Sequence, residues 1–301
     1  MKGDTIAWID PQWIDVDTGD LPFSSEMAEL ATGCMPRTDL CGSIFPCWED
    51  TSPIMIPRDK WEALSAELDR DLSALVAKIK NQKSEGTCAS NATTQALEIV
   101  LNLALSLNLW IEFSPISIYR WIAPGPGTGS TISDNLVQLR DTGALPVDSP
   151  RNRAILTEAG IPLKLLQAVG YSQSFPDDWK SVASLFRMVE WFDIRSFDGF
   201  ASCLLAGLPV VYGRAGHAIC GTRLVRKDGK WYVKYANSWG EWGDNGFGYD
   251  SESYISSAIS SYGAFAVRAT TLPDPLVKLW LSQWQLASAS TSFVTPFNVA
   301  V

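Results

Sequence analysis

One cysteine stands where a glycine-containing loop gives way to a long apolar run. Residues 81–92 read Asn-Gln-Lys-Ser-Glu-Gly-Thr-Cys-Ala-Ser-Asn-Ala, and a helical pattern follows from Ala92 to Leu107. This arrangement predicts that Cys88 lies at the N-terminus of a helix, where unpaired N–H groups and the helix dipole favour an anion. We therefore expect a lowered pKa for the Cys88 thiol, which would favour the reactive thiolate.

A nucleophilic thiolate needs a base and a group that orients the base. The single histidine of the chain, His217, stands 129 residues after Cys88, and Asn237 stands 149 residues after it. Gln82 precedes the cysteine by six positions. Asn237 opens the run Asn-Ser-Trp-Gly-Glu-Trp-Gly-Asp-Asn-Gly-Phe, which includes Trp239. Each of these residues taken alone is more often structural, but their order and spacing together favour a catalytic set.

The set resembles the motifs of the papain-like (C1) cysteine peptidases, whose histidine and asparagine follow the cysteine by roughly 130–150 residues. The resemblance covers about Pro53 to Thr270. It implies an α+β fold of two lobes, with a helical first lobe, an antiparallel β second lobe and the active site between them. It also implies that Cys88 forms a thioester with the substrate, that His217 transfers the proton, and that Asn237 orients the histidine ring.

The resemblance assigns four further residues to the site. Gln82 is expected to donate an N–H to the oxyanion, together with the backbone N–H of Cys88. Trp239 is expected to shield the bond between histidine and asparagine, and it borders the substrate. Gly127 and Gly129, in the glycine-rich loop from Ala123 to Ser130, are expected to pair with the backbone of an extended substrate. The loop lacks the Gly-Lys-Ser/Thr ending of a phosphate-binding loop.

The chain also departs from the usual family pattern. Thr87 precedes the cysteine, Ala89 stands where the family usually has tryptophan, and Glu85 occupies the position of a nearby disulfide cysteine. Only Glu241 separates the Asn-Ser-Trp-Gly box from its next Trp-Gly, where two residues are usual. This form of the cysteine motif looks most like the compact papain-like proteins encoded by some bacteriophages and bacteria.

Apolar periodicity and turn residues predict the elements around these motifs. A helix is expected to deliver Gln82 to the site, and strands of the second lobe are expected to hold His217 and Asn237. The expected helices are Pro57–Ile79, Ala92–Leu107, Ser114–Trp121, Ile132–Leu139, Asp198–Gly207 and Leu276–Leu286; the expected strands are Leu208–Tyr212, His217–Val225, Trp231–Ala236 and Gly246–Tyr249, with a hairpin turn at Asp228–Gly229.

Three segments are expected along the chain. Residues 1–52 are rich in turn formers and predict an irregular extension, either a segment laid over the catalytic domain or an autoinhibitory or partner-binding arm. Residues 53–270 form the expected catalytic domain. Residues 271–301 carry no charged residue after Lys278. An apolar tail of this kind should dock on its own domain or on another protein of an assembly.

Composition excludes several partners and cofactors. The net charge of −9 argues against a nucleic-acid-binding face. No stretch of 18 apolar residues and no signal peptide are present, so we expect no membrane span and a cytoplasmic location, or a virion if a phage encodes the protein. The six cysteines should then be reduced. Zinc is a poor interpretation because Cys34, Cys41 and Cys47 lack paired short spacings, and no cofactor is expected.

Three classes of function remain open. The first is an active cysteine peptidase with peptide or protein substrates. The second is a papain-fold structural or binding protein of a larger assembly, such as a phage virion, with weak or no catalysis; the two ends and Ala89 favour it. The third is another Cys-His-Asn acyl enzyme, such as a transglutaminase-like protein or a cell-wall amidase. The Asn-Ser-Trp-Gly box favours the peptidase over the third class.

Overall fold

The computed structural model describes residues 33–51, 54–67 and 70–290. Its fold class is α+β, as predicted, with a six-stranded antiparallel sheet in the order β1-β6-β2-β3-β4-β5. The strands are β1 (Met188–Asp193), β2 (Val210–Arg214), β3 (His217–Lys227), β4 (Lys230–Ala236), β5 (Phe247–Ser251) and β6 (Ala264–Thr270). Within the described ranges, no helix is long and apolar enough to cross a membrane.

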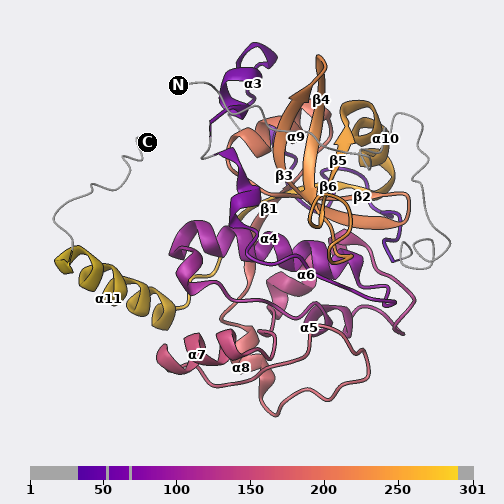
Figure 1. The fold of residues 1–301 in the computed structure, drawn as a ribbon. Coiled ribbons are helices and arrows are strands. Elements are labelled where there is room, and N and C mark those ends of the chain that lie inside the picture. The colour runs from indigo at the N-terminus through magenta and orange to yellow at the C-terminus, as the bar shows by residue number, and fades with distance from the viewer. Residues whose placement is uncertain (1–32, 52–53, 68–69, 291–301) are drawn as a thin grey trace.

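The helices divide between the two lobes. Figure 1 shows the sheet in the upper part of the molecule with α3, α9 and α10 beside it, while α5, α7 and α8 lie in the lower part and α4 runs between. The helices are α2 (Trp48–Thr51), α3 (Arg58–Ser65), α4 (Cys88–Leu105), α5 (Ile116–Tyr119), α6 (Ile132–Asp141), α7 (Pro150–Glu158), α8 (Trp179–Ala183), α9 (Phe197–Leu205), α10 (Glu252–Tyr262) and α11 (Asp274–Ser290).

Helix α4 is the central element of the helical lobe. Of its 18 residues, 16 are buried, because the sheet packs against one side and α6 against another. Leu97, Leu101 and Leu105 join the core of this lobe, as their helical spacing predicted. The buried hydroxyls of Thr93 and Thr94 donate to carbonyl oxygens one turn earlier in the helix, so their burial leaves no unpaired donor. Packing on both sides fixes the position of the first residue, Cys88.

The single helix predicted for residues 57–79 is wrong. Helix α3 ends at Ser65, and the helical segments among the described residues that follow are 3₁₀ turns, of which Leu72–Leu75 precedes the active-site loop. The apolar residues of this segment enter two different cores: Trp61 packs in the sheet lobe, whereas Leu72 packs in the helical lobe. A straight helix presents its apolar residues on one stripe and cannot serve both cores. Residue 68, part of the predicted stripe, lies outside the described residues.

The remaining predicted elements are present with shifted ends. The strand that begins at His217 and the strand that ends just before Asn237 form as expected, and Asp228 and Gly229 both have positive φ, as a tight hairpin turn requires. Helix α11 extends beyond its predicted end at Leu286. Helices α7 and α10, the edge strand β1 and the inner strand β6 were not predicted as separate elements.

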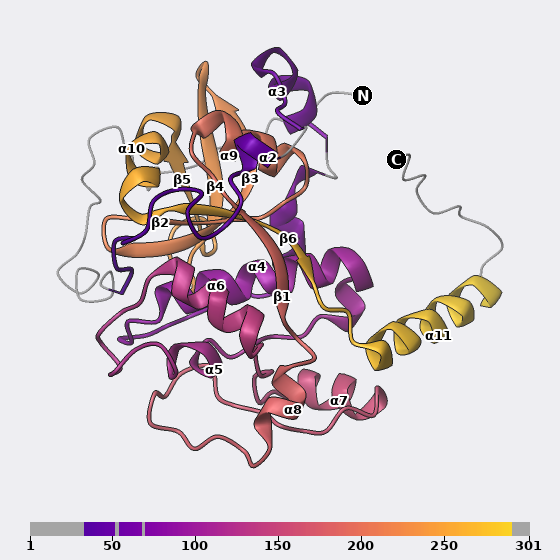
Figure 2. The same ribbon diagram turned by 180° about the vertical axis from the view of Figure 1, so that it is seen from behind.

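Residues 33–51, which we call the N-terminal strap, lie across both lobes. Figure 2 shows this segment, in indigo, running along the sheet to α2. Arg37 makes two hydrogen bonds, of 3.0 and 2.7 Å, to the buried carboxylate of Asp193 at the end of β1. Trp48 is buried against Phe192. The strap is therefore anchored to the sheet lobe by an ion pair and by apolar packing. Residues 1–32 lie outside the described part of the chain.

The C-terminal helix α11 begins on the body of the protein and extends away from it (Figures 1 and 2). Leu276 and Leu279 are buried in the core of the helical lobe, whereas Leu281 and Trp284 are 42% and 49% exposed. The first turns of the predicted tail helix therefore dock on their own domain. The apolar residues at 291–301, which we expected to need burial, lie outside the described residues.

Candidate active site

Cys88 is the first residue of α4, directly after the N-cap residue Thr87. Its side chain is 0% exposed, and the backbone N–H groups of Ala218, Ala89 and Cys88 itself lie near enough to the sulfur to act on the pKa of the thiol. Ala218 follows His217, the first residue of β3, so the start of this strand lies beside the thiol. The structure thus brings the predicted nucleophile and the predicted base to one place from opposite lobes.

His217 and Asn237 are joined by a short hydrogen bond. The Nε2 atom of His217 lies 2.7 Å from Oδ1 of Asn237, and the same oxygen accepts the backbone N–H of Ser238 at 2.8 Å. An oxygen that already accepts a backbone N–H can only accept from the ring, so Nε2 carries the hydrogen and Nδ1 holds a lone pair. Nδ1 is buried and has no hydrogen-bond partner within the described residues. The tautomer therefore suits a general base.

Trp239 covers this pair as expected. Its ring stacks on the ring of His217 with centroids 4.4 Å apart and planes 24° apart. Trp242 packs edge-on against Trp239. The indole excludes water from one face of the imidazole, which leaves Asn237 as the polar partner that fixes the ring.

Burial decides the ionisation of the two groups. Exclusion of water raises the pKa of the Cys88 thiol to about 12, although the surrounding N–H groups act in the opposite direction. Burial lowers the pKa of His217 to about 3; the bond to Asn237 opposes this, and the charge of Arg214 adds to it. The lowered cysteine pKa predicted from the helix N-terminus is therefore wrong for this conformation, because desolvation outweighs the helix. Both shifts favour the uncharged forms, a thiol and a neutral imidazole.

Gln82 is held against the asparagine box. Its backbone N–H donates to the Ser238 carbonyl at 2.8 Å, and its side-chain Oε1 accepts from the Ser238 hydroxyl at 2.6 Å. Its Nε2 donates to the Glu85 carbonyl at 2.8 Å. The Ser238 hydroxyl thus fixes which end of the amide is the donor. We did not single out Ser238 from the sequence, although its place directly after Asn237 was the available signal.

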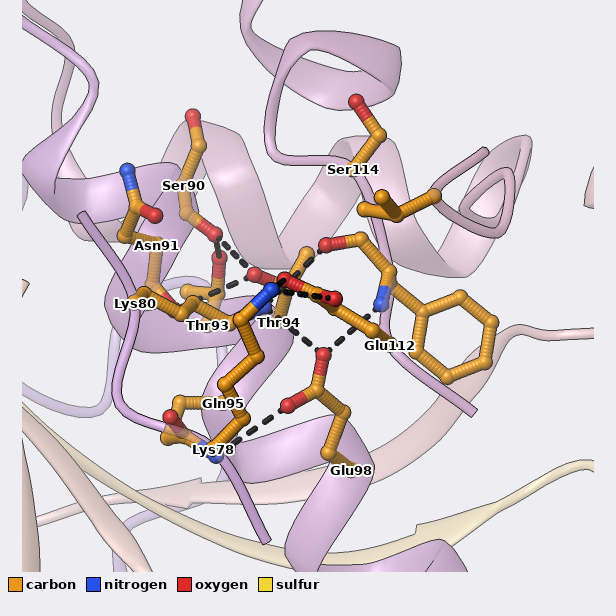
Figure 3. Close-up of polar contacts among 12 residues, drawn as sticks. Lys78, Lys80, Ser90, Asn91, Thr93, Thr94, Gln95, Glu98, Glu112 and Ser114 are labelled. Carbon is orange, nitrogen blue, oxygen red and sulfur yellow. Dashed lines mark hydrogen bonds and ion pairs between the residues drawn. The ribbon is translucent and has the colours of Figure 1, made fainter. Parts of the chain in front are cut away.

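A buried ion pair ties the Gln82 segment to α4. Lys80 Nζ lies 2.7 Å from Glu98 Oε1, and the same oxygen accepts the backbone N–H of Phe113 at 2.7 Å. Figure 3 shows this pair among the polar side chains around it, with Gln95 donating to the second carboxylate oxygen. Lys80 lies two residues before Gln82, and Glu98 stands on the helix that begins at Cys88. The ion pair therefore holds the Gln82 segment against that helix. No local sequence signal marks a pair that joins different elements.

The glycine-rich loop is fastened to the cysteine loop. The N–H of Gly86 donates to the Pro126 carbonyl at 2.8 Å, and the N–H of Gly129 donates to the Tyr119 hydroxyl at 2.9 Å. An extended segment does pair with this loop, but its partner is Ser130 rather than Gly127 or Gly129, and the segment is the N-terminal strap.

The comparisons with known proteins are structural. No model of a known protein family matches the sequence, and no curated protein matches it. Xylellain, a cysteine protease from Xylella fastidiosa, is similar with a TM-score of 0.57 at 17% identity, over 79% of this chain and 96% of xylellain. Digestive procathepsin L2 from Tenebrio molitor larval midgut is similar with a TM-score of 0.55 at 18% identity, over 86% and 83% of the two chains. The papain-like fold implied by the motifs is thus confirmed.

Proposed function

We propose that the protein is a cysteine peptidase that hydrolyses peptide bonds in peptide or protein substrates. The observation that carries the proposal is the 2.7 Å bond between His217 and Asn237, which presents a lone pair on Nδ1 at the start of the strand beside Cys88. A base held in one tautomer next to a thiol at a helix N-terminus is the arrangement that activates a sulfur nucleophile.

In the proposed reaction, Cys88 Sγ attacks the carbonyl carbon and its proton passes to Nδ1 of His217. The carbonyl oxygen becomes an oxyanion, stabilised by the backbone N–H of Cys88 and the side-chain amide of Gln82. His217 then returns the proton to the leaving amine, which departs as a thioester forms. Water attacks the thioester carbonyl with His217 as base, the C–S bond breaks, and His217 returns the proton to the Cys88 sulfur as the carboxylic acid is released. Asn237 holds the Nε2–H throughout.

The test combines labelling with substrate choice. An epoxide inhibitor of papain-type enzymes should modify Cys88 alone, and a peptide library should be cleaved by the protein but not by Cys88→Ala or His217→Ala. Both assays are run on the native chain and on Gly33→Val, because Gly33 lies in the N-terminal strap that pairs with Ser130 beside the site. Hydrolysis of muropeptides without hydrolysis of peptides would favour the cell-wall amidase class instead. A protein that is neither labelled nor active in either form would contradict both enzyme classes.

One observation favours the second candidate, a structural protein of a larger assembly. The exposed side chains of Leu281 and Trp284 stand on the part of α11 that extends from the body. In this candidate, residues 271–301 bind another protein of the assembly, of which a phage particle is one example. The absence of labelling at Cys88, combined with loss of association in a Trp284 variant, would support it over the peptidase.

A further inference from the structure

The N-terminal strap passes between the two lobes at the catalytic residues. The N–H groups of Gly33 and Cys34 both donate to the carbonyl of Gly216, at 3.0 and 2.8 Å. On the other side, the N–H of Ser130 donates to the Gly33 carbonyl at 2.8 Å, and the N–H of Met35 donates to the Ser130 carbonyl at 3.0 Å. The strap therefore joins the first lobe to the second as an extended peptide would.

These contacts lie at the catalytic centre itself. Gly216 directly precedes His217, and Ser130 is bonded through Asn135 to Ser90 on the first turn of α4. The Cys34 thiol is buried at this place, and its pKa is raised first by burial and then by the nearby Cys88. The strap thus occupies the space that a substrate would need to reach the buried Cys88 sulfur.

The passage that holds the strap admits no side chain at Gly33. A Cβ atom on Gly33 would lie 2.7 Å from the carbonyl oxygen of Gly86, and one on Gly129 would lie 2.6 Å from the carbonyl oxygen of Gly33. The φ of Gly33 is not in the left-handed region, so any residue could adopt its backbone conformation. Space alone, between three touching backbones, requires glycine here.

We propose that the passage between Gly86 and Gly129 is a glycine-selective subsite for extended peptides, filled in this structure by Gly33 as an internal ligand. The proposal rests on the proposed peptidase function, since it places the substrate beside Cys88. The Gly216 carbonyl and both backbone groups of Ser130 recognise an extended main chain, and the two glycine backbones reject a Cβ atom. The substrate class is therefore a peptide or protein with a glycine in an extended segment near the scissile bond.

The first experiment removes the internal ligand from the full-length protein. Gly33→Val places a branched side chain against the Gly86 backbone and should displace the strap without altering any residue of the site. The rate of Cys88 alkylation by iodoacetamide, measured by mass spectrometry of its peptide, should rise at least tenfold. Leu40→Ala, in the same strap but 81% exposed, is the matched control and should react as the native chain does. Gly33→Ala is the second variant if Gly33→Val fails to fold.

The second experiment tests selectivity in the displaced variant. A set of otherwise identical alanine-rich peptides carries a single glycine at successive positions, and each peptide is scored for its protection of Cys88 from alkylation. One glycine position should lower the concentration needed for half protection at least tenfold relative to the all-alanine peptide. Protection reports binding and does not depend on cleavage.

The outcomes separate this proposal from the proposed function. Equal protection by glycine and alanine peptides would overturn the selective subsite, even if both peptides are cleaved. Unchanged alkylation in both Gly33 variants would show that the strap does not close the site. Selective protection without cleavage of any bound peptide would support the subsite and count against the peptidase.

Discussion

At the scale of single residues, His217 and Asn237 share one hydrogen bond but have different tasks in the proposed reaction. His217 moves the proton, whereas Asn237 fixes the ring tautomer. We predict that His217→Ala lowers kcat/KM by about 10²–10⁴, the usual contribution of general acid–base catalysis, and that Asn237→Ala lowers it less. Steady-state kinetics on a cleaved peptide would measure both losses. Equal losses down to the background rate would mean that the two roles are wrongly assigned.

The buried histidine also predicts how stability depends on pH. The folded-state pKa of His217 is lowered to about 3, while an unfolded histidine has a pKa of about 6.5. Between these values the unfolded state binds more protons, so the free energy of unfolding falls as the pH drops below about 6.5.

His217 is the single histidine, so its contribution can be isolated. We predict that the native chain loses about 1 kcal/mol more stability than His217→Gln between pH 7 and pH 5.5, because one extra proton binds on unfolding. Denaturant unfolding curves at the two pH values measure this difference, with the carboxylates common to both proteins. Parallel losses would show that His217 is not buried in its neutral form.

Sequence spacing identified the residues of the proposed reaction, because Cys88, His217, Asn237 and Gln82 each belong to a local motif. It did not bring out Ser238, whose hydroxyl orients Gln82 across the join between two segments. It also gave the wrong direction for the cysteine pKa. A helix N-terminus is visible in the sequence, but the exclusion of water by the opposite lobe and the strap is not.

At the scale of elements, the ion pair of Lys80 and Glu98 holds the Gln82 segment on α4. Glu98→Gln would leave Lys80 buried without its countercharge, and we predict a loss of about 3–5 kcal/mol in the free energy of unfolding. Glu112→Gln is the matched control, because its partner Lys78 is 54% exposed, and it should cost about 1 kcal/mol or less. Chemical denaturation of the two variants gives the comparison. Equal costs would contradict a special role for the buried pair.

Helices and strands whose apolar face packs against a single core were predictable from the sequence. The hairpin of β3 and β4 and the apolar face of α4 follow from local pattern and turn chemistry. The segment from 57 to 79 misled because its apolar residues keep a helical spacing while Trp61 and Leu72 enter different cores. Apolar periodicity indicates that the side chains are buried, but it does not say whether they enter one core or two.

At the scale of the whole molecule, contacts between segments far apart in the sequence cover the proposed active site. The strap and the glycine-rich loop are about a hundred residues apart in sequence, yet Gly33 and Gly129 are in direct backbone contact. Nothing in the turn-rich composition of the strap marks Gly33 as a residue that fills a passage. The sequence left open whether this extension covers the domain or inhibits it; the described contacts place the strap on Gly216, next to His217, and on Ser130.

The two parts of α11 predict different results when each is altered. Leu276 is fully buried in the helical lobe, so Leu276→Ala should cost about 2–5 kcal/mol of stability. Trp284 is half exposed, and Trp284→Ala should change stability by about 0.5 kcal/mol or less. Thermal melting with sedimentation at several concentrations measures stability and association together.

Point variants are preferable to deletion of residues 272–301, because deletion would remove the docked Leu276 together with the exposed Trp284. If α11 binds a partner protein or a second copy, Trp284→Ala should abolish that association and leave the melting temperature unchanged. A large fall in the melting temperature of Trp284→Ala would show instead that this part of the helix packs on its own domain. The proposed assembly contact through residues 271–301 would then be wrong, since the tail would be completing the fold of a single chain.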